Sequence, residues 1–412
     1  MSKSLSVQFV ASEWNIKIDK VIDMMNNKVF VRSTSFYLAI VLFFVLIYSI
    51  HILSWKTMTE SDTKPITTQK EEAPRTPHTE AQTVTTKKAT VTPKVPQNSV
   101  DCFRQNAPTL PDISSVNPKR GKSVFFHETS CISYNNGKIS ITARQACAVE
   151  SAARLNPNLD VYLLYTSPGE IKMEGDESDL YLQALMKYDN VKIMHLDFAK
   201  YTKGTPVEEL YTSKKLDNSL NSIEHASDIL RYVSLWKYGG IYLDLDTITL
   251  KTLEKLKPNF ASPESTSFVA AGILGFEPDG VGHQWADMCL NDLRVGFTGK
   301  DWANSSVGVI TRLLRSICTT PVIPNMTEET CKGFKLYPTK DFYPVFWDKY
   351  MWMFQEEHFL DTLKLAENAT ATHNWNKLTR GIKINIKNVY IPYLYYAKKF
   401  CPNVLSECKE IF

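Results

Sequence analysis

The spacing of hydrophobic and polar residues divides this 412-residue chain into three regions. The first contains residues 36–53, FYLAIVLFFVLIYSIHIL, which carry no formal charge. A helix needs roughly 20 mostly apolar residues to cross a bilayer, and this run with its neighbours is long enough. We therefore predict a transmembrane helix at residues 36–55 after a cytoplasmic tail at residues 1–35. A cleaved signal peptide would be shorter and nearer the start, so we interpret the span as a retained signal-anchor. A fully buried helix is the alternative.

The second region, residues 56–118, is rich in Thr, Pro, Lys, Glu and Ser and has almost no large apolar residue. Such a composition cannot bury enough surface to offset the entropy of ordering the chain. We predict a disordered stem between the membrane and a folded domain. Its Ser, Thr and Pro content is typical of O-glycosylated stalks. A simple spacer would have the same composition.

The third region, residues 119–412, alternates between strand-like and helix-like patterns. Apolar residues at intervals of three or four predict an amphipathic helix at Glu224–Tyr238, and Gly239 and Gly240 end it. The predicted order is a strand at 123–128, a helix at 141–156, a strand at 160–166, a helix at 182–188, a strand at 191–198, the helix at 224–238 and a strand from 241. This alternation predicts an α/β fold with an open, mostly parallel sheet and helices on both faces.

Charge and cysteine content narrow the class of protein. The net charge is +3 and no block of Lys and Arg is present, so nucleic acid is not a predicted partner. All eight cysteines and three N-glycosylation tripeptides, which begin at Asn304, Asn325 and Asn368, follow the predicted span. This distribution predicts that the third region faces an oxidising lumen. The pairs Cys318/Cys331 and Cys401/Cys408 are close enough in sequence for small disulfide loops, although sequence does not determine connectivity.

The segment YGGIYLDLDTITL, residues 238–250, places two carboxylates in a run that otherwise suits a buried strand. Side chains two residues apart share one face of a strand, so Asp244 and Asp246 are expected to project together. Two close carboxylates repel each other unless a cation lies between them. The pattern therefore predicts a metal site near the carboxyl end of a strand, where ligands bind in open α/β sheets.

Asp228 and Arg231 lie three residues apart on the preceding predicted helix and so share a face. From spacing alone, an ion pair on the helix surface is the simpler interpretation. The sequence contains no glycine-rich phosphate loop, no His-Glu-x-x-His zinc motif and no Cys-x-x-Cys pair. A bound nucleotide would therefore be held through a metal ion and side chains.

The whole segment HASDILRYVSLWKYGGIYLDLDTITL resembles the sugar-nucleotide region of retaining glycosyltransferases with an Asp-x-Asp motif. An ordered series of further segments extends the resemblance to nearly everything after the stem: FFHETSC, ARQACAVESAARLNPNLDVYLLY, GILGFE, GHQWADMCL, VITRLLRSIC, FYPVFW, THNWNK and YLYYAKKFCP. Together they resemble the α1,4-glycosyltransferase family that includes lactosylceramide 4-α-galactosyltransferase and α1,4-N-acetylglucosaminyltransferase. The resemblance implies a GT-A-like fold with an open mixed, mostly parallel sheet.

The resemblance also implies roles for individual residues. Asp244 and Asp246 match the pair that holds Mn²⁺ against the diphosphate of a UDP-sugar, and His373 matches a further metal or diphosphate contact. A structural imidazole is the alternative for His373. The metal ligands implied are thus Asp244, Asp246 and His373, and oxygen donors with a single imidazole favour Mn²⁺.

The donor-binding residues implied by the resemblance overlap with the metal ligands. Asp228 and Arg231 match positions that contact the donor sugar and the nucleotide. The full predicted donor-binding set is Asp228, Arg231, Tyr242, Asp244 and His373, and the predicted catalytic set is Asp228, Arg231 and Asp246. Trp375 and Asn376 either close over the donor or, in the case of Trp375, pack in the core.

Two positions depart from the family pattern. Residues 302–308, WANSSVG, lack a Gly-Pro element that is usual there, and Ala271 replaces a common Asn. Polar contacts to the donor sugar are therefore expected to differ. Asn304 also begins a glycosylation tripeptide, so either this loop lies away from the donor or the tripeptide is not glycosylated.

The resulting hypothesis is a retaining α1,4-glycosyltransferase that moves galactose or an N-acetylhexosamine from a UDP-sugar to a terminal β-linked sugar of a glycosphingolipid. An α1,4-N-acetylgalactosaminyl- or N-acetylglucosaminyltransferase is one alternative, and an inactive, lectin-like or scaffolding descendant is another. The predicted location is the Golgi membrane, as a single-pass type II protein with residues 119–412 in the lumen. Predicted partners are the UDP-sugar, a glycolipid or glycan acceptor, the membrane and a possible second copy of the chain.

Overall fold

The structure is a computed structural model that describes residues 100–412. The predicted cytoplasmic tail, the predicted transmembrane helix and most of the predicted stem lie outside these residues. Among the described helices, none is long and apolar enough to cross a membrane. Residues 100–118, predicted to end the stem, belong to the folded part, because Val100 and Ile113 are buried and Cys102 forms a disulfide with Cys131. The folded part therefore begins earlier than the predicted boundary.

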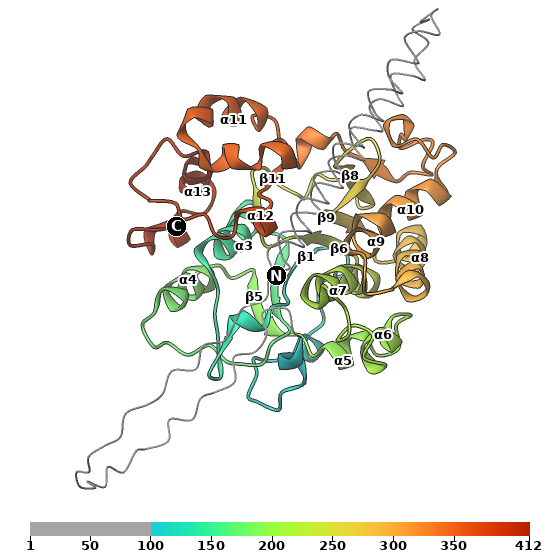
Figure 1. The fold of residues 1–412 in the computed structure, drawn as a ribbon, viewed down its shortest axis with the longest axis horizontal. Coiled ribbons are helices and arrows are strands. Elements are labelled where there is room, and N and C mark those ends of the chain that lie inside the picture. The colour runs from blue at the N-terminus through green and yellow to red at the C-terminus, as the bar shows by residue number, and fades with distance from the viewer. Residues whose placement is uncertain (1–99) are drawn as a thin grey trace, which may run out of the picture. The chain divides into compact units, whose positions relative to one another are not determined.

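A seven-stranded sheet in the order β10-β8-β9-β6-β1-β4-β5 forms the centre of the fold (Figure 1). Every neighbouring pair is parallel except the two made by β9, which runs antiparallel to β6 and β8. The predicted open, mixed and mostly parallel sheet is thus confirmed. Its strands are β1 Ser123–Glu128, β4 Asp160–Tyr165, β5 Val191–His195, β6 Gly240–Leu243, β8 Phe260–Pro263, β9 Val269–Phe276 and β10 Lys335–Leu336.

Two small two-stranded sheets accompany the central one. β7, Thr247–Thr249, pairs antiparallel with β11, Ala371–His373. β2, Tyr134–Asn135, pairs antiparallel with β3, Lys138–Ile139. The β7–β11 ribbon joins segments far apart in the sequence.

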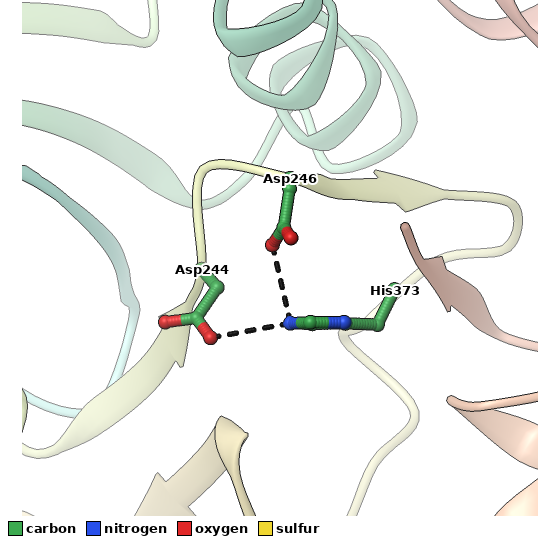
Figure 2. A group of neighbouring side chains, drawn as sticks. All are labelled: Asp244, Asp246 and His373. Atoms are coloured by element: carbon green, nitrogen blue, oxygen red, sulfur yellow. Dashed lines mark hydrogen bonds and ion pairs between the residues drawn. The ribbon is translucent and has the colours of Figure 1, made fainter. Parts of the chain in front are cut away.

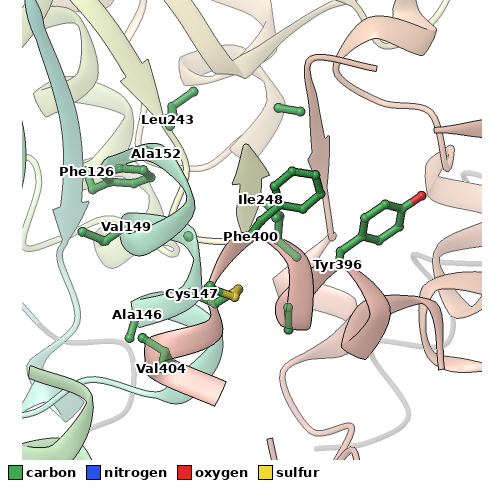
Figure 3. Close-up of a cluster of buried hydrophobic side chains, with 14 of the residues drawn as sticks. Phe126, Ala146, Cys147, Val149, Ala152, Leu243, Ile248, Tyr396, Phe400 and Val404 are labelled. Atoms are coloured by element: carbon green, nitrogen blue, oxygen red, sulfur yellow. A yellow bond between two sulfur atoms is a disulfide. The ribbon is translucent and has the colours of Figure 1, made fainter. Parts of the chain in front are cut away.

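Helices lie on both faces of the sheet, as predicted. Buried side chains of α3, α4 and α13 form a core on one face, and those of α7, α8 and α10 form a core on the other. Figure 3 shows part of the first core, which joins α3, the sheet, β7 and the C-terminal helices: Phe126, Ala152, Leu243, Ile248, Phe400 and Val404. The described α-helices are α3 Ala143–Leu155, α4 Glu177–Met186, α5 Phe198–Thr202, α6 Glu208–Thr212, α7 Ser222–Tyr238, α8 Gly280–Gly296, α9 Trp302–Ser305, α10 Val307–Ile317, α11 Phe359–Leu365, α12 Asn376–Thr379, α13 Pro392–Phe400 and α14 Pro402–Ser406.

Capping residues explain where the main helices begin and end. α3 begins at Thr142, which forms a capping box with Gln145, and it ends before Asn156-Pro157 as predicted. α4 begins at residue 177, five residues earlier than predicted, because Asp176 and Asp179 form a second capping box. α7 ends at Gly239, whose φ of +62° suits glycine and where a Cβ would collide with the backbone of Pro278. This tight turn leads directly into β6.

The disulfides differ in part from the expected pairs. Cys318–Cys331 is present, as predicted. Cys401, however, bonds with Cys147, and Cys408 is a free buried thiol, so the predicted Cys401/Cys408 loop is wrong. Proximity in sequence predicted the wrong partner for Cys401. Helix α13 packs on α3, which brings Cys401 to Cys147 across 254 residues.

We predict that Cys401→Ser destabilises the folded domain more than Cys318→Ser does. Loss of a cross-link raises the chain entropy of the unfolded state, and the loops span 254 and 13 residues. The chain-entropy model gives about 5 and about 3 kcal/mol, respectively. Thermal unfolding of both variants at one scan rate measures the difference. Cys408→Ser is the matched control, and a larger loss of stability in that variant than in Cys401→Ser would contradict the pairing.

Candidate metal centre

Asp244 and Asp246 lie in a turn between β6 and β7. The sequence predicted that they share one face of a strand, but β6 ends at Leu243. The amide of Asp244 donates to the carbonyl of Gly272 (2.8 Å), and the amide of Thr247 donates back to the carbonyl of Asp244 (3.0 Å). The two carboxylates therefore converge because the chain turns at the carboxyl end of β6. The predicted position at a strand end is confirmed, whereas the predicted extended geometry is wrong.

His373 completes a group of three possible metal ligands. It is the last residue of β11 and lies opposite Thr247 in the β7–β11 ribbon. Its Nε2 atom is 3.1 Å from Asp246 Oδ1 and 3.3 Å from Asp244 Oδ2, so that the imidazole faces both carboxylates (Figure 2). One ligand atom from each residue lies within 4.8 Å of the others. Carboxylate oxygens with one imidazole nitrogen are a donor set that suits a divalent cation such as Mn²⁺.

The segment after His373 wraps around Asp246. The Asn374 amide and side-chain Nδ2 both donate to the Asp246 carbonyl (3.0 and 2.7 Å), and the Asn376 amide donates to Asp246 Oδ2 (2.6 Å). Trp375 has a left-handed backbone, with φ +52°, which turns the Asn376 amide back towards Asp246. The Trp375 indole donates to the Val345 carbonyl (2.9 Å) and packs in the core. Packing, one of its two predicted roles, is therefore observed, and closure over the donor stays a prediction.

Asp228 and Arg231 form a buried pair rather than a pair on the helix surface. Their side chains are only 2% and 6% exposed, and the Arg231 Nη2 to Asp228 Oδ1 distance is 2.9 Å. Arg231 also donates through Nη1 to the carbonyl of Ala271 (2.8 Å) and lies 3.7 Å from Asp244 Oδ1. The interpretation as a solvated ion pair is therefore wrong. Asp228 Oδ2 has no hydrogen-bond partner among the described residues, so this oxygen is free to bind a ligand.

Tyr242, the remaining predicted site residue, contacts the Asp244 carboxylate. Its hydroxyl donates to Asp244 Oδ1 (2.6 Å), and its ring lies 4.9 Å from the Arg231 guanidinium. The structure thus brings all six predicted site residues into one connected group: Asp228, Arg231, Tyr242, Asp244, Asp246 and His373.

The charges in this group shift its pKa values in a consistent way. Burial favours protonation of Asp244, but the charge of Arg231 and the hydrogen bond from His373 outweigh burial and lower the pKa of Asp244 to about 2. Burial opposes protonation of His373, yet Asp246 and Asp244 raise its pKa above the usual value. Burial, opposed by Arg231 and aided by the charge of Asp244, raises the pKa of Asp228 to about 6. A positive charge at the centre is therefore strongly favoured.

Sequence reasoning missed two residues that shape the centre. A Cβ at Gly272 would lie 2.6 Å from Asp244 Oδ2 and 3.2 Å from His373 Nε2, so only glycine leaves these ligands their space. Ser306 lies near enough to Asp228 to lower the pKa of its carboxyl group, which places the 302–308 segment beside the centre. Every residue of β9 is buried, so the sequence pattern does not mark Gly272. Ser306 has no sequence signal either, since only the tertiary fold brings the turn after α9 close to α7.

Asn304 is held by internal contacts. Its Nδ2 donates to the Gly296 carbonyl (3.0 Å), and its Oδ1 accepts from Arg312 Nη1 (2.8 Å). A glycan on Nδ2 would break the first contact, whereas Asn325 and Asn368 are exposed. The departure at residues 302–308 therefore lies beside the centre. At the other departure, the Ala271 side chain is buried in the core between the sheet and α7.

Sequence comparisons identify relatives of known class. Residues 142–263 match the "Glycosyltransferase sugar-binding region containing DXD motif", and residues 278–408 match the "Alpha 1,4-glycosyltransferase conserved region". The human lactosylceramide 4-alpha-galactosyltransferase is 28% identical over 315 residues, which cover 75% of this chain and 83% of that protein. The human alpha-1,4-N-acetylglucosaminyltransferase is 25% identical over 265 residues, which cover 64% and 75%.

Solved structures give a weaker likeness. PaToxG glycosyltransferase aligns with a TM-score of 0.35 and 15% identity over 73% of this chain and 92% of that chain. The two family matches contain the whole candidate centre, with Asp228, Arg231, Asp244 and Asp246 in the first and His373 in the second.

We predict that the full-length protein binds one Mn²⁺ at this centre and that Asp246→Asn weakens binding by at least about tenfold, because a first ligand matters at least as much as an outer-shell partner. Titration of Mn²⁺ followed by electron paramagnetic resonance measures the affinity without reference to activity. Asp348→Asn, which alters an exposed carboxylate, is the control. Unchanged affinity in Asp246→Asn with an intact circular dichroism spectrum would contradict the assignment.

We also predict that glycans are attached at Asn325 and Asn368 but not at Asn304 when the chain is produced in animal cells. Intact glycopeptide mass spectrometry measures occupancy at each position. Asn325→Gln and Asn368→Gln are each expected to increase gel mobility by one glycan, and Asn304→Gln is expected to leave it unchanged. A fully occupied Asn304 in folded protein would show that the contact with Gly296 does not exist.

Proposed function

We propose that this chain, which belongs to the α1,4-glycosyltransferase family with a DXD motif, transfers galactose from UDP-galactose to a terminal β-linked sugar of a glycosphingolipid, with retention of the anomeric configuration. The lactosylceramide 4-alpha-galactosyltransferases among its relatives support this choice of donor and acceptor. The two matched glycosyltransferase regions favour an enzyme over the alternative of an inactive, lectin-like or scaffolding descendant.

One observation carries the proposal: Asp244, Asp246 and His373 meet within 4.8 Å although His373 lies 129 residues beyond Asp244. Repelling carboxylates have no value in a structural core, since burying such charges without a partner is unfavourable. Their convergence with an imidazole and the partly unpaired Asp228 fits a site for a metal-bound diphosphate and its sugar.

Each residue of the centre has a defined task in the proposed reaction. Asp244, Asp246 and His373 would hold Mn²⁺, which when bound supplies Lewis-acid stabilisation of the leaving UDP. Asp228 accepts a hydrogen bond from a sugar hydroxyl through its free Oδ2 atom, and Arg231 fixes the other oxygen of Asp228. Tyr242 fixes Asp244 through its hydroxyl. Preorganised groups of this kind avoid reorganisation during the reaction.

A donor with an N-acetylhexosamine is a second candidate. The alpha-1,4-N-acetylglucosaminyltransferase relative supports it. In this case the acceptor would again be a terminal β-linked sugar, and the retained metal centre would act in the same way.

The proposed location is the Golgi lumen, with the chain as a type II membrane protein. Three disulfides among the described residues support an oxidising compartment. The signal-anchor at residues 36–55 remains a prediction from the sequence.

We expect the detergent-solubilised full-length enzyme to form an α1,4-galactosylated product from UDP-galactose and lactosylceramide with Mn²⁺ and to lose activity with a chelator. Asp244→Ala should lower kcat/KM at least about 1,000-fold, because the metal contribution is several kcal/mol. Asp348→Ala should keep wild-type activity. The assay includes UDP-N-acetylglucosamine and UDP-N-acetylgalactosamine in parallel.

Product analysis by nuclear magnetic resonance separates the candidates. Turnover of an N-acetylhexosamine donor alone would favour the second candidate. Absence of metal-dependent turnover with every donor, or full activity of Asp244→Ala, would refute the proposed function.

A further inference from the structure

Arg144, the second residue of α3, is a buried cation whose hydrogen bonds go to uncharged groups. It is 8% exposed. Its Nη1 atom donates to the Thr379 carbonyl (2.7 Å) and its Nη2 atom to the Thr379 hydroxyl (2.6 Å). The guanidinium also lies over the rings of Phe354 and Tyr393, at 4.9 and 5.3 Å from the ring centroids. A buried charge without a counter-ion is unfavourable, so the contacts of Arg144 with Thr379 need an explanation beyond the stability of the helix.

Thr379 connects Arg144 with the segment that follows β11. It is fully buried and is the last residue of α12. A hydroxyl group has one hydrogen to donate. Because the Thr379 hydroxyl oxygen accepts from Arg144, that hydrogen is directed to the carbonyls of Asn374 (2.9 Å) and Trp375 (3.2 Å). Arg144 thus fixes both the position of Thr379 and the direction of its hydroxyl group.

The residues that Thr379 holds belong to the segment that binds Asp246. Asn374 donates to the Asp246 carbonyl through its amide and its Nδ2 atom, and the Asn376 amide donates to Asp246 Oδ2. Between them, Trp375 has a φ of +52°, a left-handed conformation that residues other than glycine keep only where their surroundings hold them in it. Thr379 bonds to the carbonyls of Asn374 and Trp375 and therefore helps to hold this conformation.

Resting on the metal centre of the proposed function, we propose that Arg144 is a positioning residue for the metal ligand Asp246. It holds residues 374–379 in the conformation in which the Asn376 amide binds Asp246 Oδ2. With that oxygen fixed, Asp246 Oδ1 is presented to the centre, where it lies 3.1 Å from His373 Nε2 (Figure 2). Outer-shell hydrogen bonds orient a metal ligand in this way and so raise the affinity for the metal.

A second arginine of α3 provides the comparison. Arg154, in the last turn of the helix, donates through Nη1 to the Lys399 carbonyl of α13 (2.8 Å). Like Arg144, it joins α3 to the C-terminal part of the chain through a carbonyl, but α13 lies outside the segment that binds Asp246. Arg154→Met therefore removes a contact between the same helix and the C-terminal region while leaving residues 374–379 in place.

The test measures the affinity of the detergent-solubilised full-length protein for Mn²⁺ by electron paramagnetic resonance, with folding checked by circular dichroism. Arg144→Met keeps an unbranched side chain but removes the charge and the donors. We expect it to lower the affinity about tenfold or more, as for loss of an outer-shell partner. Arg144→Lys keeps a cation that donates to one oxygen of Thr379, so its loss should be smaller. Arg154→Met should bind Mn²⁺ as the wild type does.

Thr379→Val tests the route between Arg144 and Asp246. It removes the hydroxyl group with little change of shape and should also lower the affinity for Mn²⁺. Because Arg144 and Thr379 act through the same hydrogen bonds, the double variant Arg144→Met/Thr379→Val should lose less affinity than the product of the two single losses.

Wild-type affinity for Mn²⁺ in Arg144→Met would overturn this inference, whatever the thermal stability of the variant, because Arg144 would then stabilise the fold alone. If Arg144→Met does not fold, unchanged affinity in both Arg144→Lys and Thr379→Val would overturn it. Equal losses in Arg144→Met and Arg154→Met, or independent losses in the double variant, would do the same. A wild-type protein that binds no Mn²⁺ would instead refute the metal centre. Binding of Mn²⁺ without turnover of any UDP-sugar would refute the proposed function and leave this inference in place.

Discussion

Two carboxylates held side by side in a largely buried position are the constraint on which the rest of this structure depends. Asp244 and Asp246 are 26% and 12% exposed in their side chains, so water screens their repulsion only weakly. Arg231 and His373 offset that repulsion from opposite sides. Arg231 can do so because Asp228 and the Ala271 carbonyl hold its guanidinium in place. Helix α7 and strand β9 are therefore both needed to position the charge of Arg231.

The position of the second charge, that of His373, depends on contacts between segments that are distant in sequence. His373 is fixed by the pairing of β11 with β7, and the chain that follows is fixed by Asn374, which donates to the Asp246 carbonyl. The Asn374 carbonyl in turn accepts from the hydroxyl of Thr379, and Arg144 of α3 donates to the hydroxyl and carbonyl of Thr379. A series of buried hydrogen bonds thus runs from α3 to Asp246. Helix α3 therefore helps, through these hydrogen bonds, to orient a proposed metal ligand.

The sequence was most informative where chemistry and local pattern coincide. Asp244 and Asp246 were identifiable because strands rarely carry two carboxylates, and α3 and α7 because their apolar spacing and end signals agree. Local pattern did not show that β6 stops at Leu243 and that the amide of Thr247 turns back to the carbonyl of Asp244. It also failed for Cys401, whose partner is decided by the packing of α13 on α3. Residues 100–118 look disordered by composition, yet one disulfide and a few buried side chains order them.

Some polar atoms around the centre are paired within the protein and others are not. Arg231 Nη1 and Asn374 Nδ2 each donate a hydrogen bond. Four other buried atoms have no partner among the described residues: Asp228 Oδ2, Arg231 Nε, the Tyr343 hydroxyl and Asn374 Oδ1. Only the folded structure reveals which groups lack partners, because that property belongs to the surroundings and not to the residue type. An unpaired buried polar atom is unfavourable, so a ligand that hydrogen-bonds to Asp228 Oδ2 would stabilise the centre.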